Sequence, residues 1–342
     1  MTRRAAPLAL LSLASALSLP PTCRVVRERR TGCDVLLVGC LHGAPSSEAD
    51  VEAALAFAAA SPAPRACRAV VLELCPERWR TLEREMAATA AGESPALGDA
   101  VASTVRSVRA VSRAARRESP VGAGVFSALA LVSLLQRWAI DYDPAREFKA
   151  AARAARAGGL DIVLGDRPLV STMRRFGASR ASPGRATRAT RAGLGALAAA
   201  LAGGDGYFAR ASVLNAPALR DLLRVLLPVT LATTLAAAAL SAAGEAAFDA
   251  AAGGAAGTPA GAAAGAALGD AASVAILLAS VALLGAFGEV VIRERDDVLA
   301  ESVLRACRAH PGSTVVGVVG MLHVQGIVER VAAASDPLEL GS

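Results

Sequence analysis

The chain has 342 residues, 54% of them hydrophobic and only 3% aromatic, which is enough to bury a sizeable core in one or two domains. The formal net charge is +6, but the basic residues show no stripe with interleaved aromatic side chains, so we expect no nucleic-acid partner. The cysteines form no C-x-x-C pair, which excludes a zinc ribbon and a thioredoxin-like motif and predicts buried free thiols.

Residues 1–22 place two arginines before an uncharged apolar run and close with two prolines. A short basic start and an apolar stretch of this length are typical of a targeting segment, and the run is too short to span a bilayer comfortably. A terminus that is disordered or packed on the core is the alternative. In a eukaryotic source we expect delivery to an organelle membrane, in a plastid or a mitochondrion.

Four short apolar runs predict the strands of a mostly parallel sheet. They are residues 34–39 (DVLLVG), 69–74 (AVVLEL), 161–165 (DIVLG) and 314–320 (TVVGVVG). Each run is nearly continuous in hydrophobicity, as expected for strands that are buried on both faces. Residues 23–29 add a further strand that enters the first run antiparallel. Helices between these strands would make the chain an α/β protein.

Helix signals occur between the predicted strands. Ser47 and Asp50 form an S-x-x-D capping box that opens a helix to about residue 60. Pro76 stands at the first turn of a helix over residues 77–90, where proline is tolerated. A third helix over residues 144–157 ends at two consecutive glycines.

Residues 222–288 break the alternation of strands and helices. The stretches 225–244 and 271–288 carry no charge, and arginines flank their outer ends. This pattern predicts an inserted hydrophobic, membrane-spanning helical hairpin whose two outer flanks lie on the same side. A pair of buried alanine-rich helices or a dimer interface is the alternative, and a homo-oligomer stays open. The chain then divides into a targeting segment (1–22), the first part of an α/β domain (23–221), the hairpin (222–288) and the last part of that domain (289–342).

Two of the three histidines follow predicted strands in nearly repeated segments. His42 closes the sequence GCLH and His323 closes GMLH, each three residues after a glycine. Glycine permits a sharp turn or a close approach to the backbone, and open α/β sheets bind ligands beyond the carboxyl ends of their strands. We therefore expect both imidazoles at one site. The alternative is a pair of ordinary half-buried side chains.

Polar residues end the other strands as well. Glu73 lies within apolar residues at the end of the second strand, and a carboxylate in that position needs a partner or a cation. Two neutral imidazoles and a carboxylate suit a divalent metal such as Mn, Co or Zn, with His42, Glu73 and His323 as ligands. Arg167 and Arg295 would then hold a substrate carboxylate or a developing oxyanion. Without a metal, His42 or Glu73 would serve as a general base.

Five segments in order carry a family resemblance. They read VLLVGCLHGAPSS, VVLELCPERW, IVLGDRPLVSTMRR, RERDDVLAESV and VVGVVGMLHVQGI. This set resembles the TraB (pheromone-shutdown) family, which belongs to a wider Tiki-like group that includes erythromycin esterases. The resemblance implies a Tiki-like α/β fold. It also implies functional roles for the two GxxH histidines, Glu73, Arg167, and the ERD segment of Glu294, Arg295 and Asp296.

The same resemblance implies the activity. Bacterial TraB-type members look like membrane proteins that reduce the activity of a secreted peptide pheromone, and Tiki proteins look like metal-dependent proteases. Eukaryotic TraB-like proteins are associated with organelle membranes. The chain departs from the family pattern at Cys40-Leu41, where Thr-Ala is usual, and at Met321-Leu322, where Ala-Gly is usual. These larger residues would narrow the site or alter the substrate.

Two functions are therefore expected. The first is a membrane-associated, metal-dependent hydrolase that acts on a peptide or on a small amide or ester. Its catalytic residues would be His42, Glu73, Arg167, Arg295 and His323. The second is a non-catalytic protein that binds or tethers an organelle membrane and retains the fold without the chemistry.

Overall fold

The computed structural model describes residues 19–62, 65–92, 145–179, 182–202, 206–224 and 284–334, with a few single positions between these ranges. Most of the predicted targeting segment and both charge-free stretches of the predicted hairpin, apart from a few end residues, lie outside this part of the chain. Within it, no helix is both long and apolar enough to cross a membrane.

The described chain forms a mixed α/β structure around a five-stranded sheet. The strands are β1 (Cys23–Glu28), β2 (Cys33–Cys40), β3 (Cys67–Leu72), β4 (Asp161–Leu164) and β5 (Thr314–Gly320). Their spatial order is β1-β2-β5-β3-β4, with β1 antiparallel to β2 and all other neighbours parallel. This confirms the predicted mostly parallel sheet and the antiparallel strand before it. The last strand in sequence, β5, lies in the centre of the sheet.

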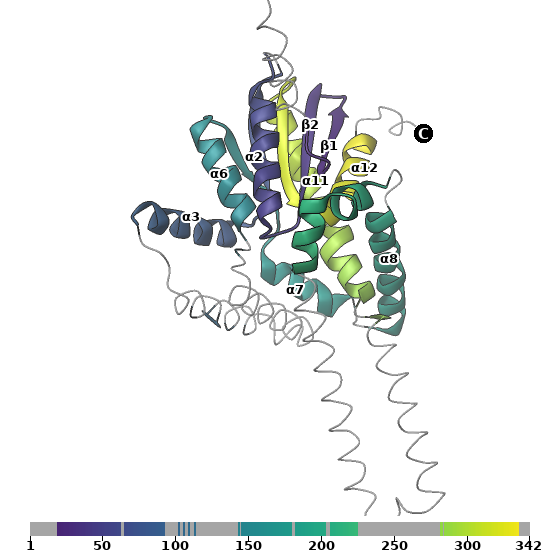
Figure 1. Ribbon diagram of the computed structural model, residues 1–342. Helices are drawn as coiled ribbons and strands as arrows, with labels where there is room; N and C mark the ends of the chain where they lie inside the picture. Colours follow the sequence, from purple (N-terminus) through teal and green to yellow (C-terminus); the bar gives the residue numbers. More distant parts are fainter. Residues whose placement is uncertain are drawn as a thin grey trace, which may run out of the picture.

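Helices cover both faces of the sheet (Figure 1). Successive strand residues point to opposite faces, so Leu36 and Val38 pack with α2 (Pro45–Ala59) and α6 (Arg146–Ala157). Val35 and Leu37 pack on the other side, with α11 (Glu294–Ala309) and α12 (Val324–Ala334). Because both faces are buried at the centre of the sheet, β2, β3 and β5 are hydrophobic over most of their length rather than alternating.

Most predicted helices are present, but the predicted capping box is wrong. The helix α2 begins at Pro45 with no side-chain cap. The Ser47 hydroxyl instead bonds the backbone of Leu41, accepting from its N–H at 2.9 Å and donating to its carbonyl at 3.0 Å. Asp50 accepts a hydrogen bond from the Thr22 hydroxyl. A capping pattern is local, whereas here the tertiary contact with the loop after β2 determines where the hydroxyl points.

The remaining elements are short helices and helical segments that surround the sheet (Figure 1). They are α3 (Pro76–Ala90), α7 (Leu169–Ala178), α8 (Pro183–Ala202), η1 (Ala209–Val213), the π-helical segment η2 (Gly288–Arg293) and η3 (Met321–His323). The helix α8 packs closely on η2 and on the residues before η2. The approach is so close that a Cβ at Gly193 would lie 1.7 Å from the Gly285 carbonyl oxygen. Glycines at this crossing let the two backbones touch.

Candidate active site

The strand order brings the candidate residues together. In the sheet, β5 lies between β2 and β3, with Cys40 of β2 opposite Gly320 and Leu72 of β3 opposite Val318. His42, His323 and Glu73 follow the carboxyl ends of these three neighbouring strands. They therefore converge at the carboxyl end of the sheet, as the two GxxH segments predict.

Glu73 lies between the two imidazoles. Its Oε2 is 3.8 Å from Nε2 of His42, and its Oε1 is 3.6 Å from Nε2 of His323. Both Glu73 and His323 are buried, whereas the side chain of His42 is 34% exposed. The site is consequently closed on the His323 side and open to solvent at His42.

Each histidine is held from behind by a buried carboxylate. His42 Nδ1 lies 2.7 Å from Oε1 of Glu147, and His323 Nδ1 lies 2.7 Å from Oδ1 of Asp296. A carboxylate at Nδ1 favours the tautomer that carries its proton there and leaves the lone pair on Nε2. Both Nε2 atoms would then present lone pairs toward Glu73, which is the arrangement found for metal-binding histidines.

Glu147 is the functional candidate that the sequence did not reveal. It is fully buried in the first turn of α6 and also accepts a hydrogen bond from the Gly43 N–H at 3.0 Å. Its helix has no motif that distinguishes it from an ordinary amphipathic helix. The one available signal is that Glu147 lies beside Phe148 on the apolar side of that helix. An unpaired carboxylate would be costly there.

Gly320 lies against all three candidate side chains, and its lack of a Cβ lets them approach the backbone closely. A Cβ added there would lie 3.0 Å from Nε2 of His42, and 3.3 Å from both Oε2 of Glu73 and Cδ2 of His323. The backbone of Gly320 has φ −60° and ψ 141°, a conformation open to any residue. Of the two roles expected for such a glycine, the structure shows a close approach of side chains to the backbone here rather than a sharp turn.

The first glycine of the other GxxH segment also provides space. A Cβ at Gly39 would lie 2.0 Å from the hydroxyl of Tyr207, and that hydroxyl donates to the Thr22 carbonyl at 2.7 Å. The left-handed conformation in this segment occurs instead at Gly43, with φ 78°. It turns the chain after His42 into α2.

Carboxylates outnumber guanidinium groups around the site in the described residues. The carboxylates are those of Glu73, Glu147, Asp166 and Asp296. Arg295 bonds both Glu73 and Asp166. Arg78 is 3.9 Å from Asp166, and Arg330 is 3.6 Å from Asp296. Neutral imidazoles would leave one negative charge, which a cation or a proton on an imidazole would offset.

Arg167 and Glu294 form a separate network. The Arg167 guanidinium donates to Glu294 at 3.0 Å, to the Val290 carbonyl at 2.8 Å and to the Thr172 hydroxyl at 3.1 Å. Arg175 donates to the same Glu294 carboxylate. This network ties α7 to η2 and to the start of α11. Of the two predicted arginines, Arg295 is the one that bonds Glu73.

The charges around Glu73 and His42 shift their protonation equilibria. Burial alone would raise the pKa of Glu73, but Arg295 and the two imidazoles outweigh it and hold that pKa well below its usual range. Burial alone would lower the pKa of His42, but Glu147 and Glu73 raise it to about 9. Without a metal, these shifts favour a protonated His42 beside an ionised Glu73 at neutral pH.

The cysteines near the site are buried and free. Cys40 and Cys75 are each less than 3% exposed, and the six cysteines of the chain form no disulfide. Burial raises the pKa of both thiols, which disfavours the nucleophilic thiolate. The expected structural role of these cysteines agrees with this environment.

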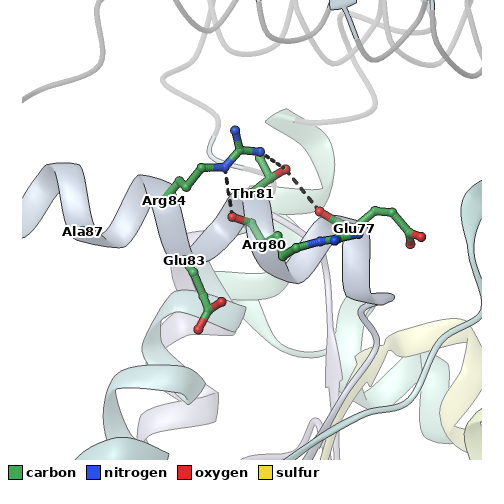
Figure 2. A pocket seen from close by; sticks show the side chains of 6 residues that line it. All are labelled: Glu77, Arg80, Thr81, Glu83, Arg84 and Ala87. Carbon is green, nitrogen blue, oxygen red and sulfur yellow. Dashed lines mark hydrogen bonds between the residues drawn. The ribbon is translucent and has the colours of Figure 1, made fainter.

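Two hollows lie outside the sheet edge. One, of about 260 Å³, is bounded by α8 and α12 and reaches Asp296, the partner of His323. The other lies along the outer side of α3 and is lined by Glu77, Arg80, Thr81, Glu83, Arg84 and Ala87 (Figure 2). Arg84 in that second hollow bonds the Arg80 carbonyl and the Thr81 hydroxyl of its own helix.

The described residues contain no group of three His, Cys, Asp or Glu side chains that could hold a metal ion as they are placed. Tetrahedral zinc ligands at about 2.0–2.1 Å from the ion are about 3.3–3.4 Å apart, whereas the imidazole–carboxylate distances here are 3.6 and 3.8 Å. Metal coordination would therefore require both imidazole nitrogens to move closer to the Glu73 carboxylate.

Among known proteins, no family model matches the chain, and no curated protein sequence matches it significantly.

Proposed function

We propose that the protein is a membrane-associated, metal-dependent hydrolase of the TraB type that acts on a peptide or on a small amide or ester. One observation supports this most strongly. Two histidines, each anchored at Nδ1 by a buried carboxylate, direct Nε2 toward the same glutamate beside the backbone of Gly320. Paired, oriented imidazoles beside a carboxylate suit a transition metal better than any other common ligand.

His42, Glu73 and His323 would hold a divalent ion such as Mn, Co or Zn. When bound, such an ion lowers the pKa of a coordinated water and supplies a nucleophile at neutral pH. Glu147 and Asp296 orient the two rings, and Arg295 bonds the Glu73 carboxylate. Because His42 is the exposed ligand, substrate would approach from its side.

The arginines have different parts in this proposal. Arg295 has its guanidinium shared between Glu73 and Asp166, so it orients the ligand and screens its charge. Arg167 bonds Glu294, the residue directly before Arg295 and Asp296. It therefore positions the first turn of α11. Neither role requires that Arg167 contact substrate.

Membrane association and the Tiki-like fold family are part of the proposal. Their support is the pair of charge-free stretches at 225–244 and 271–288 and the ordered set of five family-like segments. The insertion joins the domain through residues that contact the site region. Asp221 accepts a hydrogen bond from the Ser46 N–H at 3.1 Å, and η2 leads directly to Arg295 and Asp296.

A metal titration with matched histidine variants tests the proposal. Full-length protein is stripped with a chelator and titrated with Zn²⁺, Mn²⁺ and Co²⁺ by calorimetry, for the wild type and for His42→Ala, His323→Ala and His310→Ala. His310 is the matched control because it bonds Asp161 at 2.9 Å. It follows the end of α11, at the opposite, amino-terminal ends of the parallel strands. We expect about one ion per chain in the wild type and in His310→Ala, and a loss of at least tenfold in affinity in the other two.

Hydrolysis is then measured with the metal-loaded protein on peptide, amide and ester pools. Metal-dependent release of products that disappears in His323→Ala supports the hydrolase. Metal binding without turnover on any pool would favour the non-catalytic tethering function. Folded protein that binds none of the three metals would contradict the proposal.

A further inference from the structure

The outer face of α8 carries a stripe of arginines without acidic residues. Arg185, Arg188 and Arg191 are all exposed and recur every third residue, which places them along one side of a helix. Between Asp166 and Asp205 the sequence contains no acidic residue. The helix itself therefore supplies no carboxylate to neutralise the stripe.

The neighbouring element does not neutralise the stripe either. The face of α8 that packs on η2 contains Thr190 and Gly193, which lie against Gly285. At 100° per residue, the arginine stripe lies on roughly the opposite side of the helix. The acids of the neighbouring segment are engaged elsewhere, since Glu289 bonds Arg293 and Glu294 bonds Arg175.

Exposed apolar side chains occur at the same end of the molecule. Val281 is 40% exposed and Leu284 is 46% exposed, and they precede Gly285, which touches the N-terminal half of α8. Leu223 is 58% exposed at the other border of the segment 225–280. An exposed basic stripe on α8, together with exposed aliphatic side chains at both borders of a segment with charge-free stretches, matches the boundary of a membrane better than that of a nucleic acid.

We propose that Arg185, Arg188 and Arg191 bind the anionic headgroups of a lipid bilayer, so that the N-terminal end of α8 rests on the membrane. This inference deepens the membrane part of the proposed function and is independent of the chemistry at the histidines. Guanidinium groups suit phosphate oxygens because they donate paired hydrogen bonds and stay charged. The absence of aromatic residues from α8 removes the stacking partners that single-stranded nucleic acid would use.

Vesicle flotation of the full-length protein tests this assignment. Vesicles of phosphatidylcholine alone are compared with vesicles that also contain phosphatidylglycerol. The lipid concentration is set so that less than half of the protein binds the neutral vesicles. The test variant is Arg185→Glu/Arg188→Glu/Arg191→Glu. The control is Arg68→Glu/Arg80→Glu/Arg84→Glu, which makes the same charge change at exposed arginines. Two of these lie on α3, on the opposite side of the molecule from α8 (Figure 1).

We expect the anionic lipid to strengthen wild-type binding on the order of a hundredfold, from roughly fivefold per arginine. High salt should abolish this gain because the contacts are exposed to solvent. The α8 variant should lose the gain, and the control should retain it. Comparing the two lipid compositions separates headgroup binding by the three arginines from binding by insertion of the apolar segment 225–280.

Three results would overturn the assignment. The first is a wild type that binds both vesicle types equally, and the second is an α8 variant that keeps the full gain. The third is tighter, stripe-dependent binding to a single-stranded oligonucleotide than to anionic vesicles, which would assign the stripe to nucleic acid. The α8 variant is also compared with the wild type by denaturant unfolding. An unchanged unfolding curve shows that it is folded and keeps this test separate from that of the hydrolase.

Discussion

Replacing Gly320 with alanine tests whether the spacing of the two histidines matters for metal binding rather than for the stability of the fold. The backbone conformation at Gly320, φ −60° and ψ 141°, accepts alanine without strain. The added methyl would lie 3.0 Å from Nε2 of His42, about 0.4 Å inside the ordinary contact distance of about 3.4 Å. Glu73 and His323 are crowded to a smaller degree, so the three ligands must move apart by a few tenths of an ångström.

That displacement exceeds the tolerance of a metal site, where ligand distances stay within about 0.2 Å of their ideal values. We expect the affinity for Zn²⁺ to fall on the order of ten- to a hundredfold, which corresponds to about 1.4–2.8 kcal/mol. The free energy of unfolding without metal should change by less than about 1 kcal/mol, because the smaller entropy of the unfolded alanine chain offsets the crowding.

Calorimetric titration measures the affinity, and denaturant unfolding of the metal-free protein measures the stability. Gly195→Ala is the matched control, because a Cβ there meets nothing within 4 Å. If Gly320→Ala binds Zn²⁺ as tightly as the wild type, the space between the histidines is not where the metal binds. If it unfolds at much lower denaturant without metal, Gly320 is required for packing instead.

Three further predictions concern single residues. Glu147→Gln should weaken metal binding on the order of ten- to a hundredfold, because the amide no longer fixes the tautomer of His42; unchanged affinity by calorimetry would contradict this. Glu294→Gln should flatten the loss of stability in acid. Burial opposes ionisation of Glu294, but Arg175 lowers its pKa below the ordinary value of 4.5, so its contribution is complete above about pH 4.5 and disappears as pH falls through the folded pKa. Denaturant unfolding between pH 3 and 6 measures the difference, and parallel curves would refute it. Gly193→Ala should cost about 1–3 kcal/mol of unfolding free energy, because its Cβ would lie 1.7 Å from a carbonyl oxygen of the segment before η2; Gly184→Ala, with open space around it, is its control.

The strands and the convergence of the two histidines could be predicted from local patterns. Continuous runs of valine and leucine identify buried strands whatever their neighbours are. Glu73 was predictable for a similar reason, since a carboxylate within an apolar strand end requires a partner. The family-like segments add Arg295 and Asp296, and both contact the site.

Other parts of the site depend on contacts between distant residues. Glu147 reaches His42 because α6 packs against α2 over the same face of the sheet, 105 residues later in the chain. Ser47 has the sequence context of a helix cap, yet its hydroxyl bonds the Leu41 backbone. Arg167 shares a motif with Asp166, yet only Asp166 joins the network around Glu73.

The sequence by itself determined which segments become strands and which polar residues end them, because hydrophobic periodicity and the cost of burying charge act locally. Only the tertiary structure decided that β5 inserts between β2 and β3, and this insertion makes His323 the neighbour of both Glu73 and His42. Strand order depends on which faces the helices cover, and no local pattern encodes it. The same packing selected Glu147 and Asp296 as the carboxylates that hold the two imidazoles.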